Sequence, residues 1–187
     1  LAMDAHYAAD PICISPGNPL STHSLFYPPP VKSRTIAFLD RKHSFDSKVI
    51  SQLASLRPTF QRYSFMSIGK MSHEEVAKKL QSALVYLSCG HPEGFGLPLA
   101  EAIACGCIVV GYHGLAGRDF CKSFLYEVEF GDILGFINKL EGAIKDFELE
   151  PQQTCHKLHA AADFILRRYC LENEKQVCSQ VWSALCK

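Results

Sequence analysis

The chain has 187 residues, the length of one domain or of one domain with a tail, which argues against two full-sized domains. Hydrophobic residues make up 48% of it and charged residues 20%, so the chain can bury a core, and disorder is excluded as its main state. Nineteen basic and nineteen acidic residues cancel, so no net field draws the protein to nucleic acid. We therefore expect a folded domain without a nucleic-acid partner.

The sequence also gives no sign of a transmembrane segment, an export signal or a metal site. The most apolar stretch, residues 97–111, is interrupted by Glu101 and by glycines, so no transmembrane segment is expected. The first residues lack the charged and apolar regions of an export signal. Nine scattered cysteines, with no Cys or His pair at zinc-ligand spacing, indicate reduced thiols in a cytoplasmic protein rather than disulfides or a metal site.

Residues 1–33 are rich in proline and show neither a strand period nor a helical one. We expect an extended linker or lead-in strand there, and a folded domain over 34–168. Short apolar runs then alternate with amphipathic segments. The predicted strands are 35–39, 63–68, 84–88, 107–111 and 125–129, and the predicted helices are 45–56, 73–83, 97–105 and one opened by Asp132.

Two more helices are predicted at the C-terminal end, and the last, within 169–187, is markedly amphipathic. Its periodicity favours packing of the apolar stripe on its own domain, and the alternative is docking on a second domain.

Alternating strands and helices, with continuously apolar strands, predict a parallel sheet covered on both faces, which is an open, doubly wound α/β fold. Ligands of such sheets bind at the carboxyl ends of the strands. Functional residues are therefore expected after Leu39, Ile68, Ser88 and Gly111.

The segment 88–111 carries the most specific pattern, because it runs from one strand through a helix into the next. Gly94 and Gly96 allow a tight turn and a close approach to a ligand, and Pro98 suits the first turn of the helix. The unpaired amides at that helix start, about 95–99, are suited to an anion such as a phosphate.

Two acids flank this helix start. Glu101, one turn into the helix, can accept two hydrogen bonds from a vicinal diol, the role that an acid plays toward ribose in dinucleotide sites. Glu93 precedes the helix and is expected to project into the same cleft. Taken singly, Glu101 is equally explained as an acid favoured near a helix N-terminus, and Glu93 as a solvated loop residue.

Taken together, residues 93–110 resemble the E-x7-E motif of family-4 retaining glycosyltransferases, which have the GT-B fold: Glu93 and Glu101 are separated by seven residues, and the glycines, the proline and the following strand agree. The stretch from about 36 to 132 resembles the nucleotide-sugar-binding C-terminal domain of such enzymes. The resemblance implies the C-terminal, Rossmann-like half of a GT-B fold with extra C-terminal helices. It also implies that the acceptor-binding N-terminal domain is missing, or is supplied by a partner subunit.

Carried over by position, the resemblance implies that Glu101 binds the donor ribose and that Glu93 contacts the transferred sugar as the catalytic acid residue. Backbone amides of Gly94, Phe95, Gly96 and Leu97 would hold the sugar and diphosphate. Independently of the resemblance, His91 and His113 lie near the predicted cleft and are candidate ligands for a phosphate or base, with a purely structural role as the more common alternative for a lone histidine.

Arg41 and Lys42 occupy the place of the family's basic pair after the first strand. These enzymes use no bound metal and no cofactor beyond the nucleotide-sugar donor. Polysaccharide synthesis, and peripheral membrane association through the missing half, are family-level expectations.

Three alternatives accompany this interpretation. A nicotinamide dehydrogenase needs G-x-G-x-x-G after the first strand, where this chain has no glycine, and is excluded. A sugar-nucleotide epimerase of GT-B fold would not be expected to carry the segment around Glu93. A non-catalytic module that binds a nucleotide sugar or a partner is left open by the sequence. The isolated chain is expected to be inactive in transfer.

Overall fold

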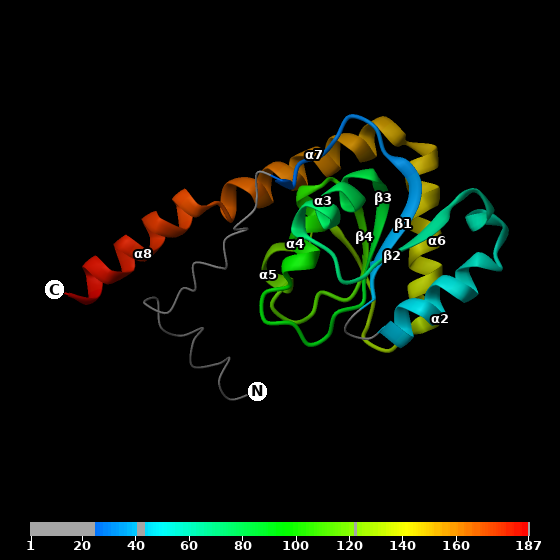
Figure 1. The fold of residues 1–187 in the computed structure, drawn as a ribbon, viewed down its shortest axis with the longest axis horizontal. Helices are drawn as coiled ribbons and strands as arrows, with labels where there is room; N and C mark the ends of the chain where they lie inside the picture. Colours follow the sequence, from blue (N-terminus) through cyan, green and yellow to red (C-terminus); the bar gives the residue numbers. More distant parts are fainter. Residues whose placement is uncertain (1–24, 41–43, 122, 187) are drawn as a thin grey trace.

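The computed structural model describes residues 25–40, 44–121 and 123–186. Five strands form one parallel sheet in the order β2-β1-β3-β4-β5 (Figure 1). The strands are β1 (Ser33–Leu39), β2 (Ser64–Ile68), β3 (Ala83–Ser88), β4 (Ile108–Gly111) and β5 (Leu125–Glu127). The predicted open, doubly wound α/β fold is confirmed, and four strands end at the four predicted residues.

Helices follow the strands as the sequence pattern predicts. They are α2 (Ser44–Ser55), α3 (His73–Ser82), α4 (Leu97–Ala104), α5 (Arg118–Cys121), α6 (Ile133–Leu149), α7 (Pro151–Arg168) and α8 (Leu171–Leu185), with a 3-10 turn, η3 (Pro58–Arg62). Ser72 and Glu75 form a reciprocal capping box at the start of α3. The carboxylate of Asp132 accepts from the amide of Gly135 and caps α6.

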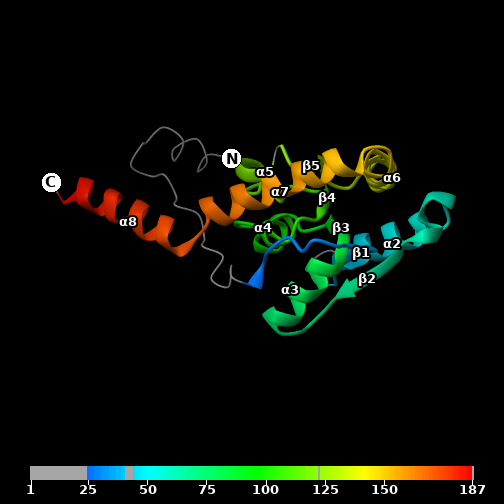
Figure 2. The same ribbon diagram turned by 90° about the horizontal axis from the view of Figure 1, so that it is seen from above.

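Two apolar layers sandwich the sheet. One consists of side chains from α3, α4, α5 and α7, and the other of side chains from α2 and α6, with sheet residues contributing to both. Figures 1 and 2 show these two sets of helices on opposite sides of the strands. All six residues of β3 are buried, because this strand lies in the middle of the sheet.

The strand order reverses direction between β1 and β3. The chain moves outward from β1 to β2, and then returns to the other side of β1 to build β3, β4 and β5. In open α/β sheets this switch point opens a crevice at the carboxyl ends of the two strands, where the flanking loops diverge. The loops after Leu39 and Ser88 therefore border the expected ligand position.

The packed part of the chain begins upstream of the expected boundary at residue 34. Phe26 is fully buried in the layer of α3 and α4. Lys32 donates from Nζ to the carbonyls of Leu80, at 3.1 Å, and Cys105, at 2.6 Å, which lie at the ends of α3 and α4. Residues 25–32 thus belong to the folded unit, whereas the rest of the predicted linker, 1–24, lies outside the described residues.

The last helix departs from the packing that its periodicity favours. No residue of α8 is buried, and Trp182 at 66% and Leu185 at 53% are among its exposed side chains. Figure 1 shows α8 projecting away from the sheet and its covering helices. The prediction that its apolar stripe packs on its own domain is wrong, because the chain turns at Cys170 and carries α8 past the end of the body.

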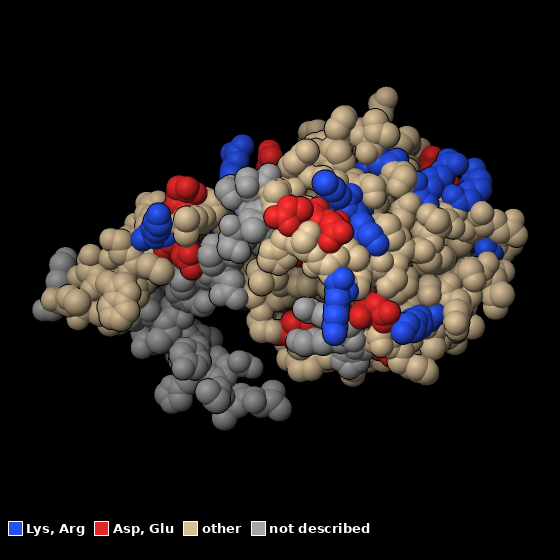
Figure 3. Space-filling model, in the orientation of Figure 1, with Lys and Arg blue, Asp and Glu red and all other residues tan. Residues whose placement is uncertain are grey.

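The distribution of surface charges and the state of the cysteines are as the sequence composition predicts. On the face shown in Figure 3, basic and acidic side chains are intermingled rather than separated. The eight cysteines within the described residues are free thiols. In this same part of the chain, no helix is long and apolar enough to cross a membrane.

Candidate functional site

Two adjoining cavities lie at the switch point of the sheet. The first is lined by Glu93 together with Leu39 and Ser88, the ends of β1 and β3. The second, of about 290 Å³, is lined by Glu101 and by residues of the loop after β2. Leu39, Tyr86 and Pro98 line both. The structure therefore brings the two acids of the motif to one hollow at the predicted edge of the sheet.

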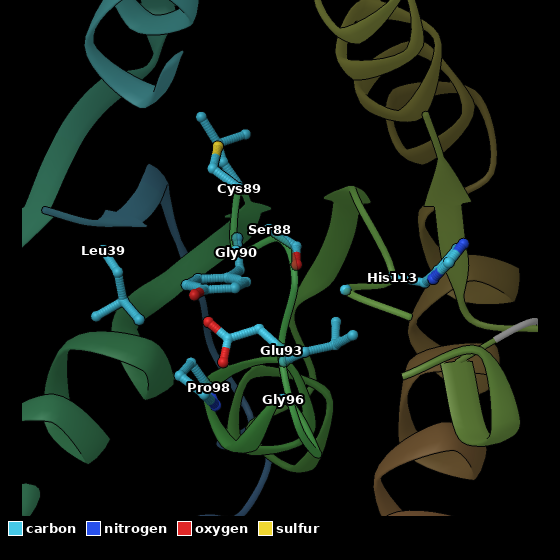
Figure 4. A pocket seen from close by; sticks show the side chains of 12 residues that line it. Leu39, Ser88, Cys89, Gly90, Glu93, Gly96, Pro98 and His113 are labelled. Atoms are coloured by element: carbon cyan, nitrogen blue, oxygen red, sulfur yellow. The ribbon is translucent and has the colours of Figure 1, made fainter. Parts of the chain in front are cut away.

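Tyr86 connects the environments of the two carboxylates. Burial of this phenol raises its pKa well above the ordinary value of a tyrosine, and the negative charges of neighbouring groups, Glu101 and Glu93 among them, add to the effect. Tyr86 therefore stays a neutral hydroxyl group at neutral pH. Figure 4 shows the carboxylate of Glu93 directed toward the space between Leu39 and Pro98.

Glu101 is held inside α4 with only 9% of its surface exposed, and it faces the second cavity. A buried carboxylate is costly unless polar groups face it, so its retention in an otherwise apolar helix indicates a polar role. The same cavity receives Lys70 and His73 from the loop after β2 and the start of α3. The sequence pattern pointed to the end of β2 but did not single out these two side chains.

The start of α4 lies between the acids. Its N-cap is Gly96, which adopts a left-handed φ of 86° and supplies no side chain to the first amides of the helix. Pro98 stands in the first turn, where its missing amide hydrogen is not needed. The amides of Leu99 and Ala100 donate to the carbonyl of Gly96, at 2.9 and 3.1 Å, so of the amides expected to be unpaired only those up to Leu97 remain for an anion at the positive end of the helix dipole.

Aromatic packing fixes the loop that leads into α4. The ring of Phe95 lies 5.0 Å from that of Phe120 and 4.9 Å from that of Tyr169, measured between centroids. Its side chain therefore belongs to the core, so only its backbone amide remains for the role that the resemblance implies. Gly94 is exposed, and a methyl group added at its Cα would lie more than 4 Å from every atom outside the neighbouring residues.

Of the two candidate histidines, His113 lines the first cavity and His91 lines neither cavity. The ring of His91 stacks on Phe130 with centroids 4.2 Å apart and planes 20° apart. His113 accepts the amide hydrogen of Leu115 at Nδ1, at 2.9 Å, and its Nε2 lies 3.5 Å from a carboxylate oxygen of Glu127. Its ring points away from the carboxylate of Glu93 in Figure 4.

The basic groups are only partly described. Arg41 and Lys42, which the resemblance assigns to the diphosphate, lie outside the described residues. Lys48 on α2 donates to Asp40 at 3.2 Å, and its side chain is 56% exposed. Among the described residues, no group of three His, Cys, Asp or Glu side chains is arranged to hold a metal ion.

Comparison with known proteins identifies the family. A family model described as "Glycosyl transferases group 1" matches residues 62–157, which is 96 of the 187 residues. An alpha-1,6-glucosyltransferase of Actinobacillus pleuropneumoniae serotype 7 (strain AP76) is 31% identical over 132 residues, covering 65% of this chain. The chain spans only 39% of that relative's length.

Solved structures share the fold. The C-terminal domain of a glycosyl transferase group 1 family protein from Francisella tularensis superposes with a TM-score of 0.59 at 17% identity, over 80% of this chain and 98% of that one. Sucrose-phosphate synthase from Thermosynechococcus elongatus gives 0.61 at 18% identity, over 87% of this chain and 50% of its own. The family match and the GT-B-like half fold lead to one conclusion: this chain belongs to the glycosyl transferases of group 1.

Proposed function

We propose that this chain is the donor-binding domain of a retaining glycosyltransferase, which moves a sugar from a nucleotide-diphosphate sugar to an acceptor. The observation that carries the proposal is the placement of Glu93 and Glu101 on adjoining cavities that share Leu39, Tyr86 and Pro98. The start of α4 lies between these cavities, at the switch point where α/β sheets bind ligands.

In this proposal the nucleoside would occupy the cavity of about 290 Å³ beside Glu101. Its carboxylate would accept both ribose hydroxyls, and the apolar side chains of Met71 and Val76 would contact the base. The diphosphate would then lie over the start of α4, and the sugar would lie at the mouth of the neighbouring hollow of about 30 Å³, which Glu93 lines. This order follows the order of chemical groups along a nucleotide sugar.

Charge at the leaving group explains how such a site accelerates transfer. The nucleoside diphosphate gains negative charge as the glycosidic bond breaks, so donors aimed at it stabilise the transition state more than the bound substrate. The α4 amides supply part of this stabilisation, and Arg41 and Lys42 at the end of β1 would supply the rest. No metal ion is needed in this scheme.

The transferred sugar is proposed to be glucose, because the curated relative is named a glucosyltransferase. The acceptor site would belong to a second domain, so the 187-residue chain alone would bind the donor without transferring the sugar. A polysaccharide acceptor remains a family-level proposal.

Titration calorimetry tests this function. We expect the 187-residue chain to bind one of UDP, GDP or ADP, and the matching glucose conjugate more tightly. Glu101→Gln keeps the size of the side chain but weakens its acceptor, and should lower nucleotide affinity at least about tenfold, as for a charge-assisted hydrogen bond. Glu150→Gln, at the exposed turn between α6 and α7, is the control and should bind as the wild type does.

Two results would contradict the proposal. Failure of the wild-type chain to bind any of the six ligands at millimolar concentration would favour a non-catalytic partner-binding module. Equal binding by wild type and Glu101→Gln would remove the assigned role of that acid.

A further inference from the structure

We propose that His113 is a positioning residue that fixes the backbone at Glu93 and, through it, the contact of Glu93 with the donor sugar. The inference rests on the proposed function for its ligand, but the physical coupling is a property of the chain itself. It reassigns His113, which the sequence pattern offered as a phosphate or base ligand, to a role one step removed from the substrate.

The backbone at Glu93 is built directly on the loop after β4. Its amide donates to the carbonyl of Gly114 at 2.8 Å, and Glu93 and Leu115 pair as an isolated parallel bridge. Gly114 has φ 66°, and a methyl group there would lie 3.0 Å from Cβ of Glu93 and 3.1 Å from the carbonyl oxygen of Gly90. The two loops are therefore in close backbone contact, so a shift of one moves the other.

The loop after β4 has a conformation that needs support. Leu115 has φ 77°, in the left-handed region that side chains with a Cβ rarely occupy. Its amide donates to Nδ1 of His113 at 2.9 Å, and its carbonyl accepts from the amide of Arg118 at 3.2 Å. The imidazole thus holds one of these two hydrogen bonds of the Leu115 backbone. Without it, Leu115 can relax and release the bridge to Glu93.

The hydrogen bond to Leu115 also determines which ring nitrogen of neutral His113 carries the proton. Because Nδ1 accepts a hydrogen, the neutral ring carries its proton on Nε2. Nε2 lies 3.5 Å from a carboxylate oxygen of Glu127 and 3.3 Å from Nη2 of Arg118. The side chain is 12% exposed, and in Figure 4 it points away from the Glu93 carboxylate. His113 lines the same cavity as Glu93, but its ring is directed away from that carboxylate, so the role assigned to it acts through the backbone.

Two substitutions separate the hydrogen bond from the bulk of the ring. His113→Ala removes the acceptor. His113→Asn replaces Nδ1 by an amide oxygen at nearly the same distance from the backbone and should restore the bond to Leu115. His159→Ala is the control, because Nδ1 of His159 bonds only to the carbonyl of Cys155 on its own helix, at 2.8 Å, on an exposed part of α7.

Amide hydrogen exchange measures the coupling without any ligand. In His113→Ala we expect the amides of Leu115 and Glu93 to exchange faster by about threefold or more, the size of one neutral hydrogen bond, and in His113→Asn to return toward the wild-type rate. His159→Ala should leave both rates unchanged. Unchanged exchange at Glu93 in His113→Ala would overturn the proposal, whatever the protein binds.

Titration with UDP and UDP-glucose, or with the GDP or ADP pair if that base binds, measures the consequence. The preference for the glucose conjugate over the bare nucleotide should fall about threefold to tenfold in His113→Ala and recover in His113→Asn, while bare nucleotide affinity stays constant. Equal loss of both affinities would overturn the positioning role. If the wild-type chain binds no nucleotide, the proposed function is contradicted. The exchange rates then still show whether His113 fixes the backbone at Glu93.

Discussion

Glu93 and Glu101 line neighbouring cavities of which Tyr86 forms a shared wall. Glu101 faces the larger hollow beside the loop after β2, and Glu93 faces the smaller one at the ends of β1 and β3, so the proposed function divides the donor between them. The two acids are therefore placed to contact different parts of one elongated molecule. Substitution of each acid is therefore expected to have a different effect on ligand affinity.

Substitution of Glu93 should affect the sugar alone. In Glu93→Gln, we expect affinity for the nucleoside diphosphate to stay within about twofold of wild type, while the extra affinity contributed by glucose falls about tenfold. Calorimetric titration of both ligands checks this difference. Glu129→Gln, an exposed acid after β5, is the matched control. Equal losses for nucleotide and nucleotide sugar would show that Glu93 supports the whole site instead.

Substitution of the basic pair should affect the diphosphate alone. Arg41→Gln or Lys42→Gln should weaken UDP or GDP binding about tenfold or more, since each removes a charge-assisted hydrogen bond. Binding of the bare nucleoside should not change. Lys48→Gln is the control, because Lys48 already pairs with Asp40 at 3.2 Å. A stronger effect at Lys48 would move the diphosphate contact onto α2.

Lys32 should stabilise the fold independently of any ligand. Its ammonium group accepts no hydrogen and donates to the last carbonyls of α3 and α4, where the helix dipoles favour a cation. Lys32→Met keeps the aliphatic length and should lower the free energy of unfolding by about 1–3 kcal/mol. Urea denaturation measures the loss, with Lys78→Met on the exposed side of α3 as control. Equal stability of both variants would contradict this role.

Glu141 should make stability depend on acid pH. Hydrogen bonds from Lys145, Thr59 and Arg57 lower the pKa of this carboxyl group to about 2 in the folded chain. Its ordinary value is 4.5, so the stabilisation is complete above that pH and is lost as the pH falls from there through 2.

The measurement compares wild type with Glu141→Gln. At pH 7 the variant should be less stable by about 1–2 kcal/mol, the size of a hydrogen bond to a charged group that remains partly solvated. Urea denaturation between pH 7 and pH 3 should show that this difference shrinks as the pH falls. A difference that stays constant over the range would rule out the carboxylate as its source.

The strands of the sheet and the segment around Glu93 and Glu101 could be predicted from the sequence for a physical reason. Strands buried on both faces must be apolar throughout, so runs such as 84–88 are visible without a structure. The helix starts were equally visible, because Ser72 and Asp132 satisfy amides only a few residues away. Since parallel strands end at one edge, these local patterns also predicted the edge at which Glu93 and Glu101 lie.

The remaining features depend on contacts that no local pattern encodes. The burial of Phe26 in a proline-rich segment, and the bond between the amide of Glu93 and the carbonyl of Gly114, arise only when distant segments meet. The apolar stripe of α8 is a different case. Periodicity shows which side of a helix is apolar, but not which surface covers it.

Removal of α8 should therefore leave the domain intact. A chain shortened by residues 171–187 should keep its free energy of unfolding within about 0.5 kcal/mol, because no side chain of α8 is buried. Ile165→Ala on α7, a fully buried residue, is the contrasting control and should lose about 2–5 kcal/mol. Urea denaturation of each variant and of the unmodified 187-residue chain measures both losses. A loss above about 2 kcal/mol on truncation would mean that α8 packs on the domain after all, as its periodicity predicts.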